Sequence, residues 1–432
     1  MSQSASIFTE IPQVTLNGAP LPDGWRWMKL GEICTRISNG TSTTQNTEGK
    51  GLPVTRIETI SSGKINIQRV GWIDSEVEDL ERYILRSGDI LFSHINSVER
   101  LGNCALYDGT PSILVHGMNL LRIEVNKELV EPFYLLSFFK SELARKFYDA
   151  NARRAIGQAS LNTKDLSKLE IPLPQLSEQQ RIASILIEQM AAVEGARAAA
   201  EAQLKAAKDL PAAYLREAFN SKEAKEWTRK KVRTWVEDGY ITDIQDGNHG
   251  ESHPRASEYV LDGVPFVMAN NIRNNTLDLT TCNYITPERA ANLRIGFSTG
   301  GDVLLTHKGS LGLTAVVPET VKSIVLTPQV TYYRPNRNLL NAEFLSLIFQ
   351  HEDFQKQLSS IAKQATRDYV GITAQKEFFL SIPPLDAQLR IAQHLHERFK
   401  AAERVKKGSQ FQLETINKLP QSLLRQAFTG KL

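Results

Sequence analysis

The chain has 432 residues, of which 41% are apolar and 23% charged, an ordinary composition for a globular protein. A formal net charge of +3 permits a polyanionic partner without requiring one. The three cysteines form no CxxC pair, so neither a disulfide framework nor a thiolate metal site is expected. There is no secretory leader pattern and no apolar run near the ~18 residues of a membrane span, so we expect a cytoplasmic protein without membrane contact.

Residues 1–172 are predicted to form a mixed α/β domain. Short β-type runs such as 89–93 alternate with Gly, Asn and Ser, and a helical stretch follows at 132–151. The loops carry amides and cations: Asn and Gln can pair with adenine and Arg with guanine, whereas Lys, Ser and Thr suit phosphate oxygens. The candidate DNA contacts here are Thr43, Thr44, Gln45, Lys50, Arg56, Asn96, Arg153, Arg154 and Gln158.

Residues 173–221 are predicted to form one long helix, because apolar residues recur at spacings of three and four. Ser177, with Gln180 three residues later, resembles a capping box just before the helix. Pro211, like Pro420 near the end of the chain, is expected to kink its helix or to restart it. The stripe consists of Ile182, Leu186, Met190, Val193, Ala196, Ala200, Leu204, Ala207 and Leu210.

Residues 222–381 are predicted to form a second domain that loosely repeats the first. "GVPFVMANNI" (263–272) resembles "GLPVTRIETI" (51–60), "GDVLLTH" (301–307) resembles "GDILFSH" (88–94), and "AKQATRD" (362–368) echoes "IGQASLN" (156–162). A second helical stretch is expected at 342–362. The candidate DNA contacts are Asn248, His249, Arg255, Asn270, Asn271, Arg273, Asn274, Lys308, Lys363 and Arg367.

Residues 382–432 are predicted to repeat the long helix. "LPAAYLREAFNS" (210–221) returns as "LPQSLLRQAFTG" (419–430) at an offset of 209, without insertion or deletion back to Pro174 and Pro383. One apolar stripe is usually core packing within one domain. Two matched stripes, one after each domain, favour two long antiparallel helices packed as a coiled coil. We therefore predict an α+β fold with two similar mixed α/β domains, two long helices and a pseudo-twofold internal repeat.

No catalytic motif is found. The chain has no GxxxxGK[ST], GxGxxG or HExxH sequence, and no Asp/Asn-Pro-Pro-aromatic stretch. His249 and His253 are four residues apart, but Gly250 and Pro254 oppose a helical metal site. Asp209 with Glu223 and Lys225 loosely resembles the carboxylate–lysine group of a nuclease active site. A solvated helix end explains these three charged residues better. We expect no catalytic residue and no metal.

Several motifs together carry a family resemblance. "LPDGW", "GDILFSHINS", "LEIPLPQLSEQQRIASIL", its partner "LSIPPLDAQLRIAQHL" and the paired helix ends resemble the specificity subunit of a type I restriction-modification system, from about residue 20 to 432. The resemblance implies two target-recognition domains, each reading one half of a split DNA sequence, and helices that set the separation of the two halves.

The resemblance also implies partners. Two methyltransferase subunits would dock on the helices, and restriction subunits would bind through the methyltransferase subunits. S-adenosylmethionine, ATP and Mg are expected to bind only to those partner subunits. The partner-binding candidates are Gln179, Arg181, Arg216, Phe219, Gln388, Arg390, Arg425 and Phe428. Two alternatives stay open: a DNA-binding protein that works alone, and a coiled-coil scaffold without a nucleic-acid role.

Overall fold

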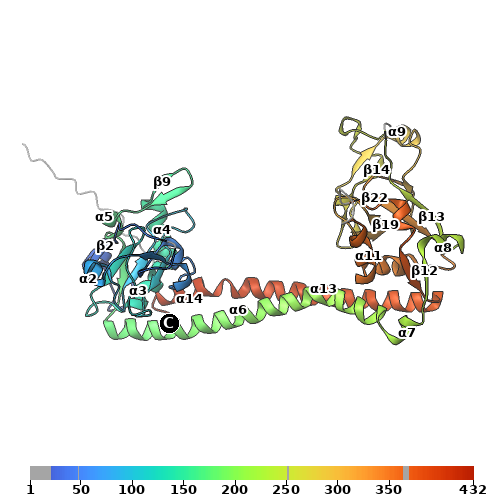
Figure 1. Ribbon diagram of the computed structural model, residues 1–432. Coiled ribbons are helices and arrows are strands. Elements are labelled where there is room, and N and C mark those ends of the chain that lie inside the picture. Colours follow the sequence, from blue (N-terminus) through green and yellow to red (C-terminus); the bar gives the residue numbers. More distant parts are fainter. Residues whose placement is uncertain (1–20, 47, 251–252, 363–368) are drawn as a thin grey trace, which may run out of the picture. The chain divides into compact units, whose positions relative to one another are not determined.

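The computed structural model describes residues 21–46, 48–250, 253–362 and 369–432 (Figure 1). The chain forms two compact units, Met1–Ala200 with Gln412–Leu432, and Glu201–Phe411. Each unit therefore contains one domain and a part of each long helix, so the units divide the chain differently from the four predicted segments. The predicted segment boundaries lie within a few residues of the ends of the long helices.

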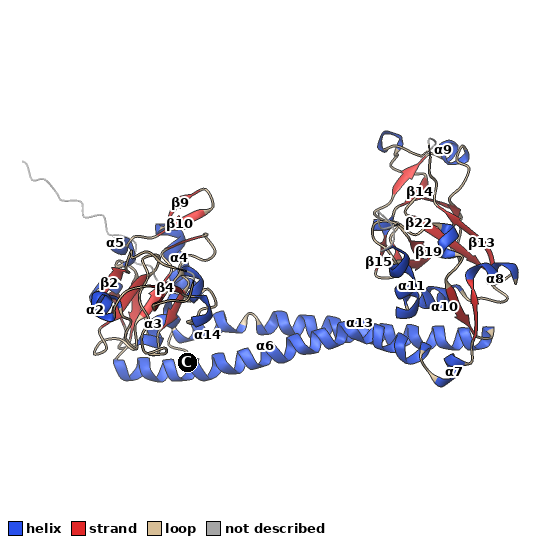
Figure 2. Cartoon of the chain, viewed as in Figure 1, coloured by secondary structure: helices blue, strands red, loops and turns tan. Residues whose placement is uncertain are grey.

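The first unit is built on a four-stranded antiparallel sheet in the order β2-β8-β5-β7 (Figure 2). Its strands are β2 (Cys34–Asn39), β8 (Leu121–Val125), β5 (Ile90–Phe92) and β7 (Cys104–Leu106). Smaller sheets pair β1 (Arg26–Lys29) with β11 (Glu170–Leu173), β3 (Leu52–Val54) with β4 (Gly71–Ile73), and β6 (Ile95–Asn96) with β10 (Gln158–Ser160) and β9 (Arg153–Ala155). The helices are α1 (Leu30–Ile33), α2 (Val77–Leu80), α3 (Pro132–Phe139), α4 (Glu142–Asn151) and α5 (Thr163–Leu166).

The second unit repeats this plan. Its main sheet has the order β13-β22-β19-β20, with β13 (Ile241–Asp246), β22 (Val330–Pro335), β19 (Val303–Thr306) and β20 (Thr314–Val316), and β12 (Thr228–Lys231) pairs with β23 (Phe379–Ile382). Both main sheets carry a register shift at the same place in the first strand, between Cys34 and Arg36 and between Ile241 and Asp243. The loose sequence repeat is therefore a structural repeat.

The second unit contains these further elements. A sheet of β17 (Asn283–Ile285), β14 (Val264–Val267), β21 (Ile324–Leu326) and β18 (Phe297–Ser298) and a hairpin of β15 (Ile272–Arg273) and β16 (Thr276–Leu277) complete the strands. The helices are α7 (Lys222–Lys225), α8 (Val232–Glu237), α9 (Pro287–Ala291), α10 (Ala342–Gln350), α11 (Glu352–Ala362) and α12 (Ile372–Gln375).

The predicted helical stretches at 132–151 and 342–362 are confirmed, and each is divided into two helices. In the first unit Ser141 separates α3 from α4, because its hydroxyl accepts a hydrogen bond from Ala144 N (3.3 Å) and caps the new helix. His351 stands between α10 and α11 in the second unit. Both helices of each pair contribute to the core of their own unit, through Tyr134 and Tyr148 in the first and Phe344 and Phe354 in the second.

The two long helices are α6 (Leu176–Phe219, 44 residues), roughly 66 Å at ~1.5 Å per residue, and α13 (Leu385–Ile416), continued by α14 (Leu419–Ala427). In the first unit the start of α6 shares a core with α14 through Leu186 and Leu424. In the second unit the end of α6 shares a core with the start of α13 through Leu215 and Leu395. The helices therefore run antiparallel, as predicted.

Three details of the helix predictions were wrong. Ser177 lies inside α6, which begins at Leu176, so it cannot cap the helix from outside. Helix α6 continues through Pro211, so the restart predicted there is wrong. The restart predicted at Pro420 is confirmed, because the second copy stops at Ile416 and begins again at Leu419, where the missing N–H of Pro420 falls in a first helical turn and leaves no hydrogen bond unmade. The second helix was predicted to repeat the apolar stripe at the offset of 209, with Val405 at the place of Ala196. That stripe is narrower than predicted, because Val405 is 45% exposed, while Leu395, Ala402, Ser409 and Ile416 are buried at the seven-residue interval of a coiled coil.

None of the helices in the described part of the chain has the length and hydropathy of a membrane-spanning segment.

Candidate nucleic-acid interface

The structure brings four of the predicted DNA contacts of the first unit together in one small sheet. Asn96 ends β6, Arg153 and Arg154 lie in β9, and Gln158 begins β10. Figure 1 shows β9 projecting from the body of the unit. The hairpin of β9 and β10 supplies three of the four residues, and the fold brings Asn96 to them from a distant part of the chain.

The strand register divides these four residues between two faces of the small sheet. Ala159 lies opposite both Asn96 and Arg154, and Ser160 lies opposite Arg153. Since neighbours across an antiparallel sheet share a face, and Ala159 is buried, Arg154 and Asn96 lie on the face turned toward the body of the unit. Arg154 Nη2 donates to Asp149 O (3.3 Å) there.

Arg153 and Gln158 occupy the opposite, solvent-exposed face of the hairpin. Between the strands, Ile156 and Gly157 form a two-residue turn, with Gly157 at a φ of 72° that suits glycine. Ile156, whose side chain is 106% exposed, was not among the residues predicted from the sequence. The exposed hairpin face therefore offers a cation, an amide and an apolar tip.

The remaining candidates of the first unit lie on the segment between β2 and η1 (Ile57–Ile60). Thr43 and Thr44 are exposed, and Gln45 is half-buried. Lys50 is exposed and forms an ion pair with Glu48 (3.0 Å), and Arg56 is exposed with its Nε 4.0 Å from a carboxylate oxygen of Glu58. The four exposed residues are open to a polyanion and Gln45 is so in part, although both cations already have an acidic neighbour.

In the second unit the asparagine-rich run forms the β15–β16 hairpin. Asn274 and Asn275 have φ values of 50° and 59°, the left-handed conformation that a two-residue turn requires and that asparagine tolerates. Arg273 and Asn270 are exposed, and Arg273 Nε donates to Asn270 O (2.8 Å). The turn itself explains part of the asparagine content, and Arg273, Asn270 and the exposed Asn274 stay available for DNA.

Two predicted contacts in the second unit are wrong because their side chains are buried. Asn271 is 2% exposed, and its Oδ1 accepts from Met268 N (2.9 Å), which fixes the turn before β15. Asn248 is also 2% exposed, and its backbone N donates to Leu326 O (2.7 Å). Neither side chain has a surface that DNA could touch.

The other candidates of the second unit divide into described and undescribed residues. His249 and Arg255 are exposed, and Lys308 is exposed beside β19 in a bridge to Tyr369. That bridge matches the pairing of Ile95 with Ser160 in the first unit. The predicted contacts Lys363 and Arg367 lie outside the described residues.

An acid–arginine pair supports the main sheet of each unit; both side chains are buried in the first unit, whereas the arginine is partly exposed in the second. Asp89 forms an ion pair with Arg122 (2.8 Å) and Asp302 forms one with Arg334 (2.8 Å), so the Gly-Asp of both repeated motifs has a structural role. Burial raises the pKa of Asp89, while a backbone hydrogen bond from Arg86 and the charge of Arg122 oppose that rise. In the first unit, removing Arg122 would leave the buried charge of Asp89 without its partner.

Two of the predicted partner contacts, Gln179 and Gln388, have no exposed side-chain surface. Gln179 Oε1 accepts from Glu131 N (3.0 Å), and its Nε2 donates to Leu129 O (3.0 Å) and Pro174 O (2.9 Å). Gln388 makes the equivalent bonds to Asn341 N (2.8 Å), Leu339 O (3.0 Å) and Pro383 O (2.8 Å). These glutamines join each long helix to its own domain, so the prediction that they contact a partner protein is wrong.

The predicted partner contact Phe428 is also buried. Its ring lies 5.2 Å from that of Tyr134 and 5.1 Å from that of Phe138, which locks α14 into the first unit. Phe219 occupies the equivalent place in the second unit, stacked on Phe344 (5.6 Å) and His351 (5.0 Å), and it is half-buried. Both phenylalanines anchor a helix end in a domain.

The four arginines predicted to contact a partner are exposed, and two of them have acidic neighbours within their own unit. Arg181 donates to Glu178 and to the carbonyl of Leu432, and Arg390 pairs with Glu223 (2.7 Å). Arg425 lines a cavity between α4 and α14. Arg216 lies near the end of α6. These side chains stay accessible to a protein partner.

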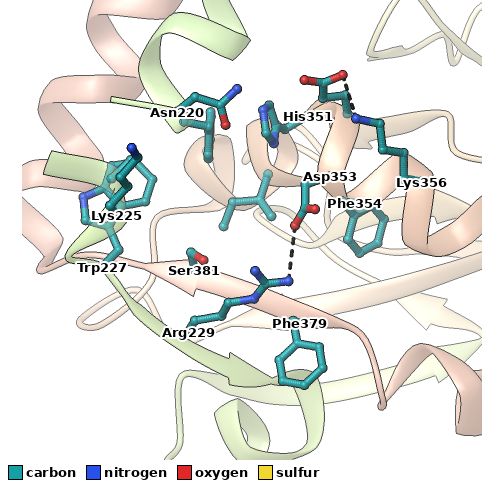
Figure 3. Close-up of a pocket in the computed structure, with 14 residues that line it drawn as sticks. Asn220, Lys225, Trp227, Arg229, His351, Asp353, Phe354, Lys356, Phe379 and Ser381 are labelled. Atoms are coloured by element: carbon teal, nitrogen blue, oxygen red, sulfur yellow. Dashed lines mark hydrogen bonds and ion pairs between the residues drawn. The ribbon is translucent and has the colours of Figure 1, made fainter. Parts of the chain in front are cut away.

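A larger cavity of about 420 Å³ lies in the second unit, where the end of α6 meets β12, α11 and β23 (Figure 3). Phe219, Trp227 and Phe379 give it apolar walls, and Arg229 reaches Asp353 across it (3.5 Å). The cavity beside Arg425 in the first unit holds about 40 Å³ and lies at the equivalent helix end. In each unit, the end of the long helix therefore meets its domain beside a cavity.

Among the described residues, no group of three or more His, Cys, Asp or Glu side chains is placed to hold a metal ion.

Comparison with known proteins identifies the class. The family described as "Type I restriction modification DNA specificity domain" matches residues 22–196 and 236–415, one copy in each half of the chain. The chain belongs to this family and is a specificity subunit of a type I restriction-modification system.

Individual relatives extend the match over nearly the whole chain. The putative type I restriction enzyme MjaX specificity subunit of Methanocaldococcus jannaschii is 29% identical, over 95% of this chain and 94% of its own length. The EcoBI specificity subunit of Escherichia coli is 23% identical, over 98% of this chain and 90% of its own length. Among solved structures, the HsdS subunit from Thermoanaerobacter tengcongensis has the same fold, with a TM-score of 0.63 at 22% identity over 97% of this chain and all of its own.

Proposed function

We propose that each domain of this specificity subunit reads one half of a bipartite duplex DNA sequence. The observation that carries the proposal is the duplication of the DNA specificity domain, with a shared frame of sheets and different exposed loops. Two domains with the same scaffold and different polar surfaces suit two different half-sites. Exposed cations such as Arg153 and Arg273 supply phosphate or guanine contacts, and Gln158 suits adenine.

The partner side of the proposal concerns the long helices. Methyltransferase subunits dock along them, two per chain, and restriction subunits bind through the methyltransferases. Exposed arginines and a hollow at each helix end support such docking. The chain itself is non-catalytic; S-adenosylmethionine, ATP and Mg bind only to the partners. The complex works in the cytoplasm, where its DNA target lies.

The test selects duplexes from a randomised DNA pool with the full chain in complex with its methyltransferase. We expect enrichment of two short sequences separated by an unread spacer of fixed length, with adenine methylation mapped inside them. Enrichment of one contiguous sequence, or of none, would contradict the proposal.

The same experiment separates the alternatives. A DNA-binding protein that works alone would bind the selected duplex equally tightly without methyltransferase. A coiled-coil scaffold would show no salt-dependent binding to DNA at all.

A further inference from the structure

The tip of the β9–β10 hairpin carries a large apolar side chain that stands free of the core of its own unit. Ile156 is 106% exposed, whereas most isoleucines of the first unit are buried or half-buried. A single exposed apolar residue is common on protein surfaces and has no meaning by itself. Its setting decides whether it is a contact site.

The hairpin presents Ile156 on a narrow and well-anchored turn. Ala155 pairs with Gln158, so only Ile156 and Gly157 lie beyond the last paired residues. At the base, Ala159 is 1% exposed in the core, and Leu161 N donates to His94 O (2.8 Å). The third strand, β6, holds β10 in place, so the tip is positioned by the domain and is not a free loop.

The charge around the tip favours a polyanion. Arg153 and Arg154 precede Ile156 on the same hairpin, and both are exposed. Leu261 in the second unit is as exposed to solvent as Ile156, at 100%, but it lies next to Asp262 and three residues after Glu258. Phosphates would be attracted to the first tip by its two arginines, whereas the second tip has Asp262 beside it and a Glu258 that is already paired with Arg289 (2.5 Å).

The shape fits one groove of DNA. A two-stranded ribbon enters the major groove, which is about 12 Å wide. The apolar group that unmodified bases present there is the C5 methyl of thymine. We propose that the hairpin enters the major groove tip first, with the side chain of Ile156 against the C5 methyl of a thymine, so that Ile156 is a specificity-determining residue. The inference rests on the proposed DNA-reading function.

The test uses the full chain with its methyltransferase and the duplex selected by wild-type protein. Each thymine is replaced in turn by deoxyuridine, which lacks only the methyl group, and binding is measured by competition. Wild type should lose affinity about three- to fivefold at one thymine, the effect of one buried methyl group. Ile156→Ser should bind the thymine and deoxyuridine duplexes equally, and Ile156→Leu should restore part of the preference.

Leu261→Ser is the matched control, and it should keep the wild-type preference at that position. Both side chains are exposed, so neither variant should unfold, and equal melting temperatures check this. Equal thymine preference in wild type and Ile156→Ser, or a selected site without a sensitive thymine, would overturn the inference while leaving the bipartite selection intact. Failure of wild type to select any bipartite sequence would instead overturn the proposed function, and the inference with it.

Discussion

At the scale of single residues, Gln179 joins α6 to its domain through three buried hydrogen bonds. Gln179→Ala leaves one backbone N–H and two carbonyls without these partners, so we expect the free energy of unfolding to fall by about 3 kcal/mol. Urea denaturation measures this loss. Gln180→Ala, the exposed neighbour, should change stability by less than about 0.5 kcal/mol. If Gln179→Ala keeps wild-type stability but no longer binds methyltransferase, Gln179 contacts the partner protein as the sequence predicted.

A second residue-scale prediction concerns pH. His116 is buried, and burial lowers the pKa of its imidazole from 6.5 to about 4, against a raising hydrogen bond to Leu120 O. At a pH between these two pKa values, the unfolded chain binds a proton at His116 that the folded chain does not bind. The stability that the neutral imidazole contributes is therefore fully present above pH 6.5 and is lost as the pH falls toward 4. From about pH 7 to about pH 5 the loss due to this group should be about 2 kcal/mol.

Urea denaturation of wild type and His116→Gln at both pH values isolates that contribution. The variant cannot titrate at this position, so its stability should fall less on acidification. Equal losses in the two proteins would show that His116 does not drive the pH dependence.

At the scale of elements, the hairpin register gives its two arginines different roles. Arg153 lies on the exposed face, whereas Arg154 lies on the face of the buried Ala159 and donates to Asp149 O. Arg153→Ala should weaken binding to all duplexes and reduce the slope of log K against log salt by about 1. Arg154→Ala should leave that slope closer to wild type. Titrations of labelled duplex at several salt concentrations measure both slopes, and a larger change for Arg154→Ala would contradict the face assignment.

Sequence periodicity predicted the long helices and the repeat well, because an apolar stripe that persists over many turns keeps to one face only in a continuous helix. A kink or restart was predicted at both prolines because "KDLPA" and "NKLPQ" look alike, yet a restart occurs at only one, since α6 continues through Pro211 and the second copy stops at Ile416 and restarts at Leu419. Polar residues were harder still. The role of Gln179 depends on carbonyls such as Leu129 O, which the fold brings from a distant segment. Ile156 has the residue type of a core position, and only the hairpin turn reveals its exposure.

At the scale of the whole molecule, both long helices take part in both units. Leu186 of α6 lies in the core of the first unit and Leu215 in that of the second. The chain passes from one unit to the other after Ala200 in α6 and after Phe411 in α13. These two points are therefore the places to change helix length without altering either domain.

The last prediction uses these points to test whether the helices set the spacing of the half-sites. Four residues inserted after Ala200 and four after Phe411 lengthen each helix by roughly 6 Å, close to two base pairs at ~3.4 Å each. Four residues are near one helical turn, so the buried stripe stays roughly in register, as in a coiled-coil stutter. Duplex selection should then return both half-sites unchanged and a spacer longer by about two base pairs.

Two-residue insertions at the same points are the matched control. They rotate the apolar stripe on one side of each insertion by about 200° relative to the other side, so the buried stripe is no longer continuous across Ala200 and Phe411, and stability or assembly should be lost. Thermal melting and gel filtration with methyltransferase measure that loss. If the four-residue variant is folded, binds methyltransferase and selects the original spacer, the helices do not measure DNA, and the separation of the half-sites must be set within the domains.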